Sequence, residues 1–105
     1  MDHKVEVTDN PDAKRFEITA DGRLAGFAEY HRLTGRLVFT HTEVGEEFEG
    51  QGLASRLIHD ALDAARAEGV PVVPRCPFVA RYIERHPEYR DLVAGDHTGV
   101  AQPSS

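Results

Sequence analysis

The sequence predicts a mixed α+β domain, in which an antiparallel β-meander is followed by a helix, a strand and a second helix. Apolar residues alternate at period two as far as Val44, and after Gly52 they recur at helical spacing. The 105 residues suffice for one compact domain but not for two. We assign residues 1–93 to this domain and residues 94–105, which contain glycine, proline and serine, to a flexible C-terminal tail.

Strands are expected throughout the first half of the chain, separated by turn residues. They lie around Val5 and Val7, over residues 15–20, around residues 24–27, and over residues 36–44. The Asp21-Gly22 pair tolerates positive φ, so it predicts the hairpin between the second and third strands. The last of these strands is nearly continuous in its apolar part, and we therefore expect it to be largely buried.

The second half begins with a long amphipathic helix. Apolar side chains recur at helical spacing over residues 53–65, with charged residues between them. Gly69 supplies the end of this helix. Two prolines then hold residues 70–74 extended, because each proline disfavours the α region for the residue before it. This segment is the fifth predicted strand.

A second helix is expected after that strand. Pro77 suits the first helical position, where its missing N–H is not needed, and the helix continues over residues 78–85. Pro87 prevents its further extension. We expect His86 and Tyr89 to finish this last helix and to cover the core.

Charge and cysteine content exclude several classes of protein. The chain carries 12 Lys and Arg against 18 Asp and Glu, a net charge of −6, so no long-range field draws it to nucleic acid or to an anionic membrane. Its single cysteine, Cys76, cannot form an internal disulfide, which suits a reducing cytoplasm. No export signal and no membrane-spanning run is visible. We expect a cytoplasmic protein that is monomeric or weakly dimeric.

The most informative stretch is residues 44–54, where a strand end, a glycine-bearing loop and a helix start follow one another. A helix N-terminus attracts phosphate through its unpaired N–H groups and its positive dipole end, and glycine allows close approach to the backbone. Gly50-Gln51-Gly52 is therefore a candidate phosphate-binding loop. An ordinary strand-to-helix turn is the alternative, because Gly-x-Gly alone is a weak signal.

Cys76 is a candidate nucleophile, because it immediately precedes Pro77. If Pro77 is the first helical residue, Cys76 occupies the N-cap position, where the helix dipole and free N–H groups stabilise a thiolate. The alternative is a buried cysteine that packs as a small apolar residue.

His41 and Glu43 share one face of their strand, so an imidazole and a carboxylate are expected side by side. Such a pair can act as a general base, with the carboxylate holding the imidazole. The alternative is two polar residues on a half-exposed strand. Metal binding is not expected, because four further histidines are scattered along the chain. They are His3, His31, His59 and His97.

Short motifs along the chain combine into one pattern. They are His41-Thr42-Glu43-Val44, Glu49-Gly50-Gln51-Gly52, Cys76-Pro77-Phe78-Val79, Tyr82-Ile83 and His86-Pro87-Glu88-Tyr89. Over residues 16–93 this pattern resembles the GNAT superfamily of N-acetyltransferases, and in particular its small YjdJ-like subfamily. The resemblance implies a splayed sheet with an acyl-CoA cleft and acetyl-CoA as co-substrate, without a metal.

The resemblance also implies roles for individual residues. The pantetheine arm would lie between the strands that contain residues 40–44 and 70–75, which places Cys76 close to the thioester. Tyr82 aligns with a tyrosine that protonates the leaving thiolate, although packing is an alternative role for it. The residues expected to bind the co-substrate are Thr42, Val44, Glu49, Gly50, Gln51, Gly52, Leu53, Ala54 and Ser55.

Glu49 departs from the superfamily pattern, which usually has arginine or glutamine at this place. Together with Glu46 and Glu47 it would repel a ligand of about four negative charges. Three arginines on the neighbouring helices can offset this repulsion, or they can simply form solvated helix faces. They are Arg56, Arg81 and Arg85.

The function expected from the resemblance is acetyl-CoA-dependent transfer of an acetyl group to an amine. At this length there is little material for a deep acceptor pocket, so we expect a protein or peptide amine, and the negative charge favours a basic one. Transfer can be direct or can pass through Cys76, and thioester hydrolysis would use the same thiol. The competing class is a non-catalytic acyl-CoA-binding or sensor module.

Overall fold

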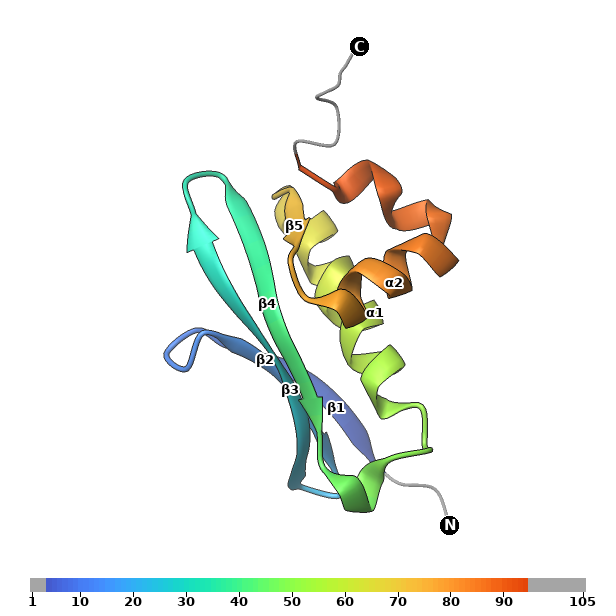
Figure 1. Ribbon diagram of the computed structural model, residues 1–105. Coiled ribbons are helices and arrows are strands. Elements are labelled where there is room, and N and C mark those ends of the chain that lie inside the picture. The colour runs from blue at the N-terminus through green and yellow to red at the C-terminus, as the bar shows by residue number, and fades with distance from the viewer. Residues whose placement is uncertain (1–3, 95–105) are drawn as a thin grey trace.

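The computed structural model describes residues 4–94. It confirms the mixed α+β architecture and the order of the main elements, and adds two short 3₁₀ helices (Figure 1). The elements are β1 (Val5–Asn10), β2 (Arg15–Ala20), β3 (Arg23–Leu33), β4 (Arg36–Val44), η1 (Glu46–Phe48), α1 (Leu53–Glu68), β5 (Val72–Pro74), α2 (Pro77–Arg85) and η2 (Pro87–Leu92).

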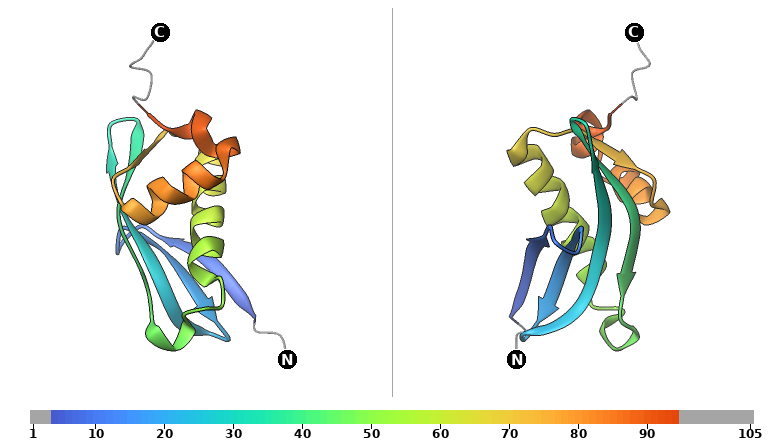
Figure 2. Two further views of the ribbon diagram at one scale, coloured as in Figure 1. Left: turned by 45° about the vertical axis from the view of Figure 1, so that its right-hand side comes forward. Right: turned by 90° about the vertical axis from the view of Figure 1, so that its left-hand side faces the viewer.

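The strands form one sheet in the order β1-β2-β3-β4-β5. The first four strands pair antiparallel, as the turn residues predict, and β5 joins β4 in parallel after the crossover through α1. Both α1 and α2 lie on the same face of this sheet (Figures 1 and 2). The opposite face of the sheet is therefore not covered by a helix of the described chain.

The core lies between the sheet and α1. Leu57, Ile58 and Leu62 of the helix are fully buried against the inner face of the sheet, where Ile18 and Phe39 meet them. Each such side chain stabilises the fold by about 1.5–3 kcal/mol through removal of apolar surface from water. The end of α1 at Gly69 is confirmed, since this residue adopts a left-handed conformation and its N–H bonds to the carbonyl of Ala65.

A β-bulge at Thr40 decides which side chains of β4 face the helices. His41 pairs with Glu29 and Phe39 pairs with Tyr30, so Thr40 has no partner residue on β3. Across the bulge the alternation shifts by one residue. Phe39 and Thr42 consequently lie on the helical side, while His41 lies on the outer side.

The parallel strands β4 and β5 part immediately after they have paired. Their register runs from Leu37 opposite Val72 to Phe39 opposite Pro74, and the N–H groups of Arg75 and Cys76 both bond to the Phe39 carbonyl at 3.0 Å. Beyond this point, no strand within residues 4–94 pairs with the free side of β4 over residues 40–44. The expected splay is therefore present.

The end of the chain differs from the expectation in one respect. His86 and Tyr89 do not finish α2, because the helix ends at Arg85 and a separate 3₁₀ helix begins at Pro87. Proline lacks an N–H and disfavours the α region before it, and His86 accordingly has φ −128° and ψ 76°. Tyr89 is nevertheless buried in the core, as expected.

Two further expectations concern the chain as a whole. No helix among the described residues is long and apolar enough to cross a membrane. Of the predicted flexible tail, residues 95–105 lie outside the described residues.

Candidate functional site

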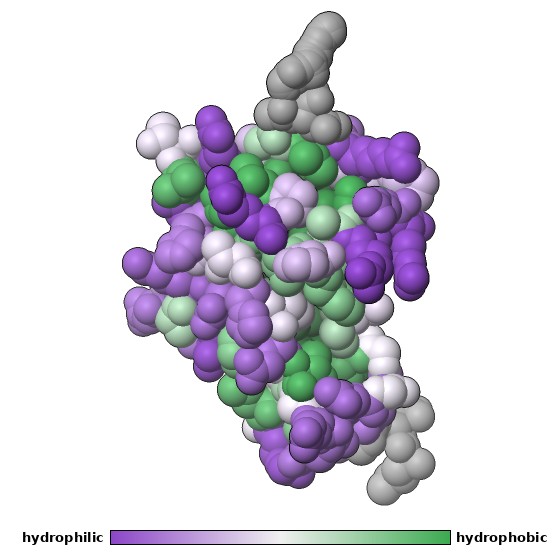
Figure 3. Space-filling view, viewed as in Figure 1, coloured by the Kyte–Doolittle hydropathy of each residue, from purple (hydrophilic) through white to green (hydrophobic). Residues whose placement is uncertain are grey.

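A groove of about 340 Å³ lies where β4 ends and α1 begins. Its walls come from the end of β4, from η1 and the glycine loop, and from the first turn of α1, with one side chain from α2. Eight of the nine predicted co-substrate residues line it, and Gln51 does not. The eight are Thr42, Val44, Glu49, Gly50, Gly52, Leu53, Ala54 and Ser55. Figure 3 shows apolar residues gathered between β4 and the two helices on this face.

The glycine loop leaves the first turn of α1 without a cap. Gly52 is the N-cap residue in a left-handed conformation with φ 73°, and no side chain caps the helix. The first backbone bond of the helix joins the Arg56 N–H to the Gly52 carbonyl. The N–H groups of residues 53–55 precede that bond and are therefore open to an external acceptor. A helix N-terminus in this state is a ready-made anion site.

Gly52 is not required by packing within the protein. A Cβ built on this residue meets nothing within 4 Å. Its left-handed φ disfavours other residues, and the space beside it is open to the groove. The glycine thus provides close access to the backbone at the point where the free N–H groups gather.

Cys76 does not line the groove, but it contacts Thr42, which does. The structure confirms that Cys76 is the N-cap residue of α2 and that Pro77 is the first helical residue. The thiol donates a hydrogen bond to Thr42 Oγ1 at 3.4 Å and is only 4% exposed. The cysteine therefore combines the helix N-terminus expected of a nucleophile with the burial expected of a packing residue.

His41 and Glu43 form the expected side-by-side pair. His41 Nε2 lies 3.0 Å from Glu43 Oε1, and the two side chains are 54% and 61% exposed. A carboxylate only accepts hydrogen bonds, so Nε2 carries the proton and Nδ1 is the nitrogen that can take one. The pair lies on the outer side of β4, near the Phe27 ring, and not on the side where Cys76 meets Thr42.

Tyr82 does not line the groove. It lies in an adjoining hollow between α1 and α2, where its ring stacks on His86 with 3.9 Å between ring centroids. Burial raises the pKa of Tyr82, followed by the influence of the nearby carboxylate of Glu88. The phenol is therefore protonated at neutral pH, but the structure does not bring it together with Cys76, His41 and Glu43.

The charges around the groove are predominantly negative. Glu43 and Glu49 line it. Glu47 is bound to Arg23 by an ion pair at the same end of the molecule. Arg56, considered above as an offsetting charge, is instead paired with Asp60 at 2.9 Å on the surface of α1.

The groove also has two aromatic residues in its wall, and sequence patterns did not single out either residue as ligand-binding. Phe48 of η1 and Phe78 of α2 both line it, and Phe78 is 39% exposed. In the sequence, a phenylalanine two residues after an N-cap is a weak indication of a ligand-binding residue. Helix periodicity places it on the exposed face of the helix and gives no sign of a groove there. Its role as a wall follows from the packing of α2 beside α1.

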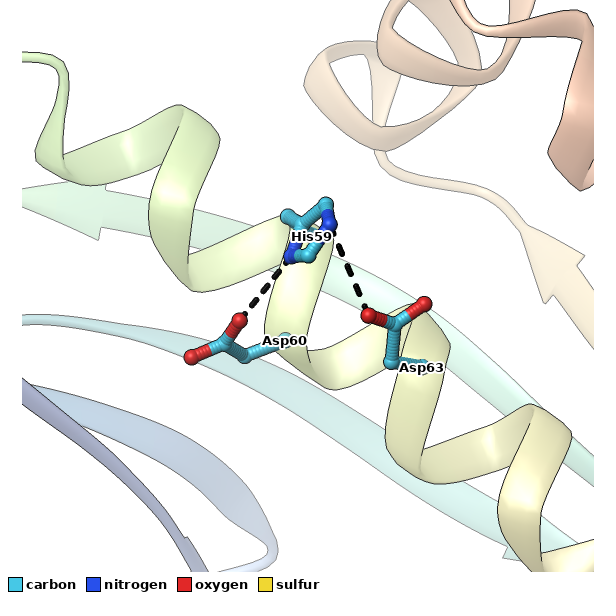
Figure 4. Close-up of side chains that lie close together, drawn as sticks. All are labelled: His59, Asp60 and Asp63. Atoms are coloured by element: carbon cyan, nitrogen blue, oxygen red, sulfur yellow. Dashed lines mark hydrogen bonds and ion pairs between the residues drawn. The ribbon is translucent and has the colours of Figure 1, made fainter.

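His59 has carboxylate neighbours, contrary to the expectation of a scattered histidine. Figure 4 shows it between Asp60 and Asp63 on α1, with ligand-type atoms of all three within 4.8 Å of one another. The two carboxylates are already bonded, because Arg56 donates to Asp60 and the Tyr89 hydroxyl donates to Asp63 at 2.7 Å. We therefore assign no metal to this cluster.

The fold and the groove together define a class of α+β domain, in which a helix N-terminus faces the gap between two parting parallel strands. The family model of the GCN5-related N-acetyl-transferases matches residues 15–92. The chain therefore belongs to this family. None of the curated proteins matches it in sequence. The assignment to the YjdJ-like subfamily stays a prediction.

Solved structures show the same fold. A GCN5-like protein of Staphylococcus aureus is 22% identical in sequence and superposes with a TM-score of 0.65. The match covers 84% of this chain and 86% of the Staphylococcus aureus chain. The ribosomal-protein-alanine N-acetyltransferase of Brucella melitensis biovar Abortus is 24% identical with a TM-score of 0.52. The match covers 87% of this chain and 66% of that enzyme. The ribosomal-protein-S18-alanine N-acetyltransferase of Escherichia coli is 23% identical with a TM-score of 0.54. The match covers 57% of this chain and 39% of that enzyme. The chain thus spans less than two thirds of either ribosomal-protein enzyme.

Proposed function

We propose that this protein transfers an acetyl group from acetyl-CoA to the amine of a protein or peptide. One observation carries the proposal: the uncapped N-terminus of α1 and the open side of Gly52 face a groove that leads to the parting of β4 and β5. A phosphate-bearing acyl carrier fits this arrangement, because its anionic and acyl ends need two different environments.

The pyrophosphate would accept hydrogen bonds from the N–H groups of residues 51–55. The pantetheine arm would then follow the free side of β4 over residues 42–44, where its amides can bond to a strand edge that no other described strand pairs with. This path leads toward Cys76 and Thr42. The thioester carbonyl would lie where the two strands part.

Direct transfer assigns a role to His41 and Glu43. The neutral amine attacks the thioester carbonyl from the outer side of β4, a C–N bond forms, and the C–S bond breaks to release CoA as a thiolate. The proton lost by the attacking nitrogen passes to His41 Nδ1, while Glu43 stabilises the imidazolium. The thiolate takes a proton from solvent. Because Tyr82 lies in the adjoining hollow, this route assigns no proton transfer to it.

The surroundings of Glu43 support a peptide acceptor. Glu43 borders the groove and also a shallow hollow of about 170 Å³ on the outer side, beside Leu24 and Phe27. Such an open surface suits an extended peptide better than an enclosed metabolite. Carboxylates at this place favour a cationic acceptor. Two structural neighbours are named as N-acetyltransferases of a ribosomal protein, so their named acceptor is a protein.

An assay of CoA release with and without basic peptides tests the proposal. We expect CoA release that depends on the peptide, with one acetyl group added to the peptide for each CoA. Release without an acceptor would instead indicate thioester hydrolysis. Binding of CoA with no release under any condition would indicate the non-catalytic acyl-CoA-binding or sensor module.

A covalent route through Cys76 is a second candidate, carried by the N-cap position of this cysteine and its contact with Thr42. In this route the Cys76 thiolate attacks the carbonyl, CoA leaves, and the amine then displaces the acetyl group from the cysteine. We favour direct transfer, because the Cys76 thiol is buried and donates a hydrogen bond to Thr42 Oγ1.

Intact-protein mass spectrometry distinguishes the two routes. The protein is mixed first with acetyl-CoA and then with an amine. If transfer is direct, Cys76 should carry no acetyl group that the amine removes. A Cys76→Ala variant should retain acetyl transfer within about tenfold of the wild-type rate, since it loses only packing at the thioester end. An adduct that the amine discharges, with an inactive Cys76→Ala variant, would establish the covalent route.

Glu49→Gln is expected to tighten CoA binding modestly, about two- to fivefold. The change removes a negative charge from the groove wall, and exposed charges contribute about 0.2–1 kcal/mol each. Isothermal titration at low salt measures this effect. Glu6→Gln, on β1 and outside the groove, is the matched control. Weaker binding by Glu49→Gln would mean that the carboxylate contacts the ligand favourably.

A further inference from the structure

A second hollow of about 170 Å³ lies between α1 and α2. It adjoins the groove, because Ser55 and Phe78 line both. A ligand that reaches the N-terminus of α1 can therefore extend past these two residues without leaving the protein surface. The rest of its wall comes from the end of α2. The residues there are Arg81, Tyr82, Arg85 and His86.

Two arginines of this wall make no hydrogen bond or ion pair with any residue that the structure describes. Arg81 and Arg85 are four residues apart on α2, so they lie on one face of the helix, and both are exposed. Neither forms an ion pair with another residue of the described chain 4–94. Like charges at this spacing repel each other, and an anion bound between them removes the repulsion. Arg56 of α1, by contrast, is already neutralised by Asp60.

The Tyr82 hydroxyl gives an independent indication of a ligand. Tyr82 is only 6% exposed, and its hydroxyl makes no hydrogen bond to any of the residues that the structure describes. A buried polar group without a partner is rare in folded proteins. Because burial raises its pKa, this hydroxyl is a donor at neutral pH. It lies in the wall of the same hollow as the two arginines.

We propose that this hollow binds the 3′-phosphate of CoA, with Arg81 and Arg85 as its charge partners. The inference rests on the proposed function. Within residues 4–94, no basic side chain lines the groove, whereas Glu43 and Glu49 do. Cationic side chains of α2 line the adjoining hollow. A phosphomonoester carries nearly two negative charges at neutral pH and accepts bidentate hydrogen bonds from arginine.

Binding of CoA and of 3′-dephospho-CoA, measured by isothermal titration at low salt, tests the inference. The wild type should bind CoA about two- to thirtyfold tighter than 3′-dephospho-CoA, because two exposed arginine–phosphate interactions contribute about 0.2–1 kcal/mol each. The double variant Arg81→Gln and Arg85→Gln should bind both ligands alike, with the affinity of the wild type for 3′-dephospho-CoA. Arg36→Gln with Arg90→Gln alters the net charge equally outside the hollow and should keep the preference.

Each other outcome has a defined meaning. Equal binding of both ligands by the wild type would overturn the inference and leave the CoA groove intact. A preference that persists in the double variant would overturn the assignment to the arginines. Failure of the wild type to bind either ligand would overturn the proposed function itself. Thermal unfolding of each variant shows that it is folded, which is expected because all four arginines are exposed.

Discussion

His41→Gln is expected to lower kcat for acetyl transfer about 10²–10⁴-fold, the range typical of removing a general base. Glutamine can still bond to Glu43, so the strand keeps its shape, but it has no nitrogen that takes a proton near neutral pH. The KM for acetyl-CoA should change little, because His41 lies on the outer side of β4 and not in the groove. Steady-state kinetics with a fixed peptide acceptor measure both constants.

His31→Gln is the matched control for this prediction. His31 is an exposed histidine on β3, paired with Val38, and lines neither the groove nor the hollow beside Glu43. Its replacement should leave kcat unchanged. If His41→Gln and His31→Gln had equal activities, His41 would be a solvated strand residue, and the proton would have to leave the amine by another path.

Gly52→Val is expected to weaken CoA binding at least about tenfold. The valine methyl groups would hold the pyrophosphate away from several backbone N–H groups, and one charge-assisted hydrogen bond is worth about 1.5–3 kcal/mol. The substitution also imposes strain, since the backbone at Gly52 has φ 73°. Titration with CoA at a temperature where the variant is folded gives the affinity.

Gly35→Val separates strain from loss of contact. Gly35 has φ 70° and, like Gly52, has open space where a Cβ would lie, but it belongs to the turn between β3 and β4. Both variants should lose similar stability, whereas only Gly52→Val should lose affinity. Unchanged CoA binding by Gly52→Val would mean that close approach of the ligand to this backbone is not the reason for the glycine.

Local sequence signals were sufficient for much of the site. Gly52 and Pro77 mark the first turns of α1 and α2, and the structure places the N-caps of both helices accordingly, at Gly52 and Cys76. The pairing of His41 with Glu43 follows from period two along one strand. These features depend on residues that are close in sequence, so backbone preferences alone predict them.

Other features depend on contacts between distant segments. From Leu37 and Phe39 alone, period two would place His41 on the inner face of β4, but the bulge at Thr40 moves it to the outer face. That bulge is set by the register between β3 and β4. The hollow beside Tyr82 likewise arises only when α2 packs beside α1. No pattern within a single element reports either feature.

The central claim is that CoA binds with its pyrophosphate on the N-terminus of α1. An NMR titration of the ¹⁵N-labelled protein with CoA tests it most directly, because each backbone N–H reports its own environment. We predict the largest shift changes at the N–H groups of residues 51–55, with further changes at Thr42 and Val44 along the edge of β4. Changes confined to other parts of the sheet, or no saturable change at these residues, would contradict the claim.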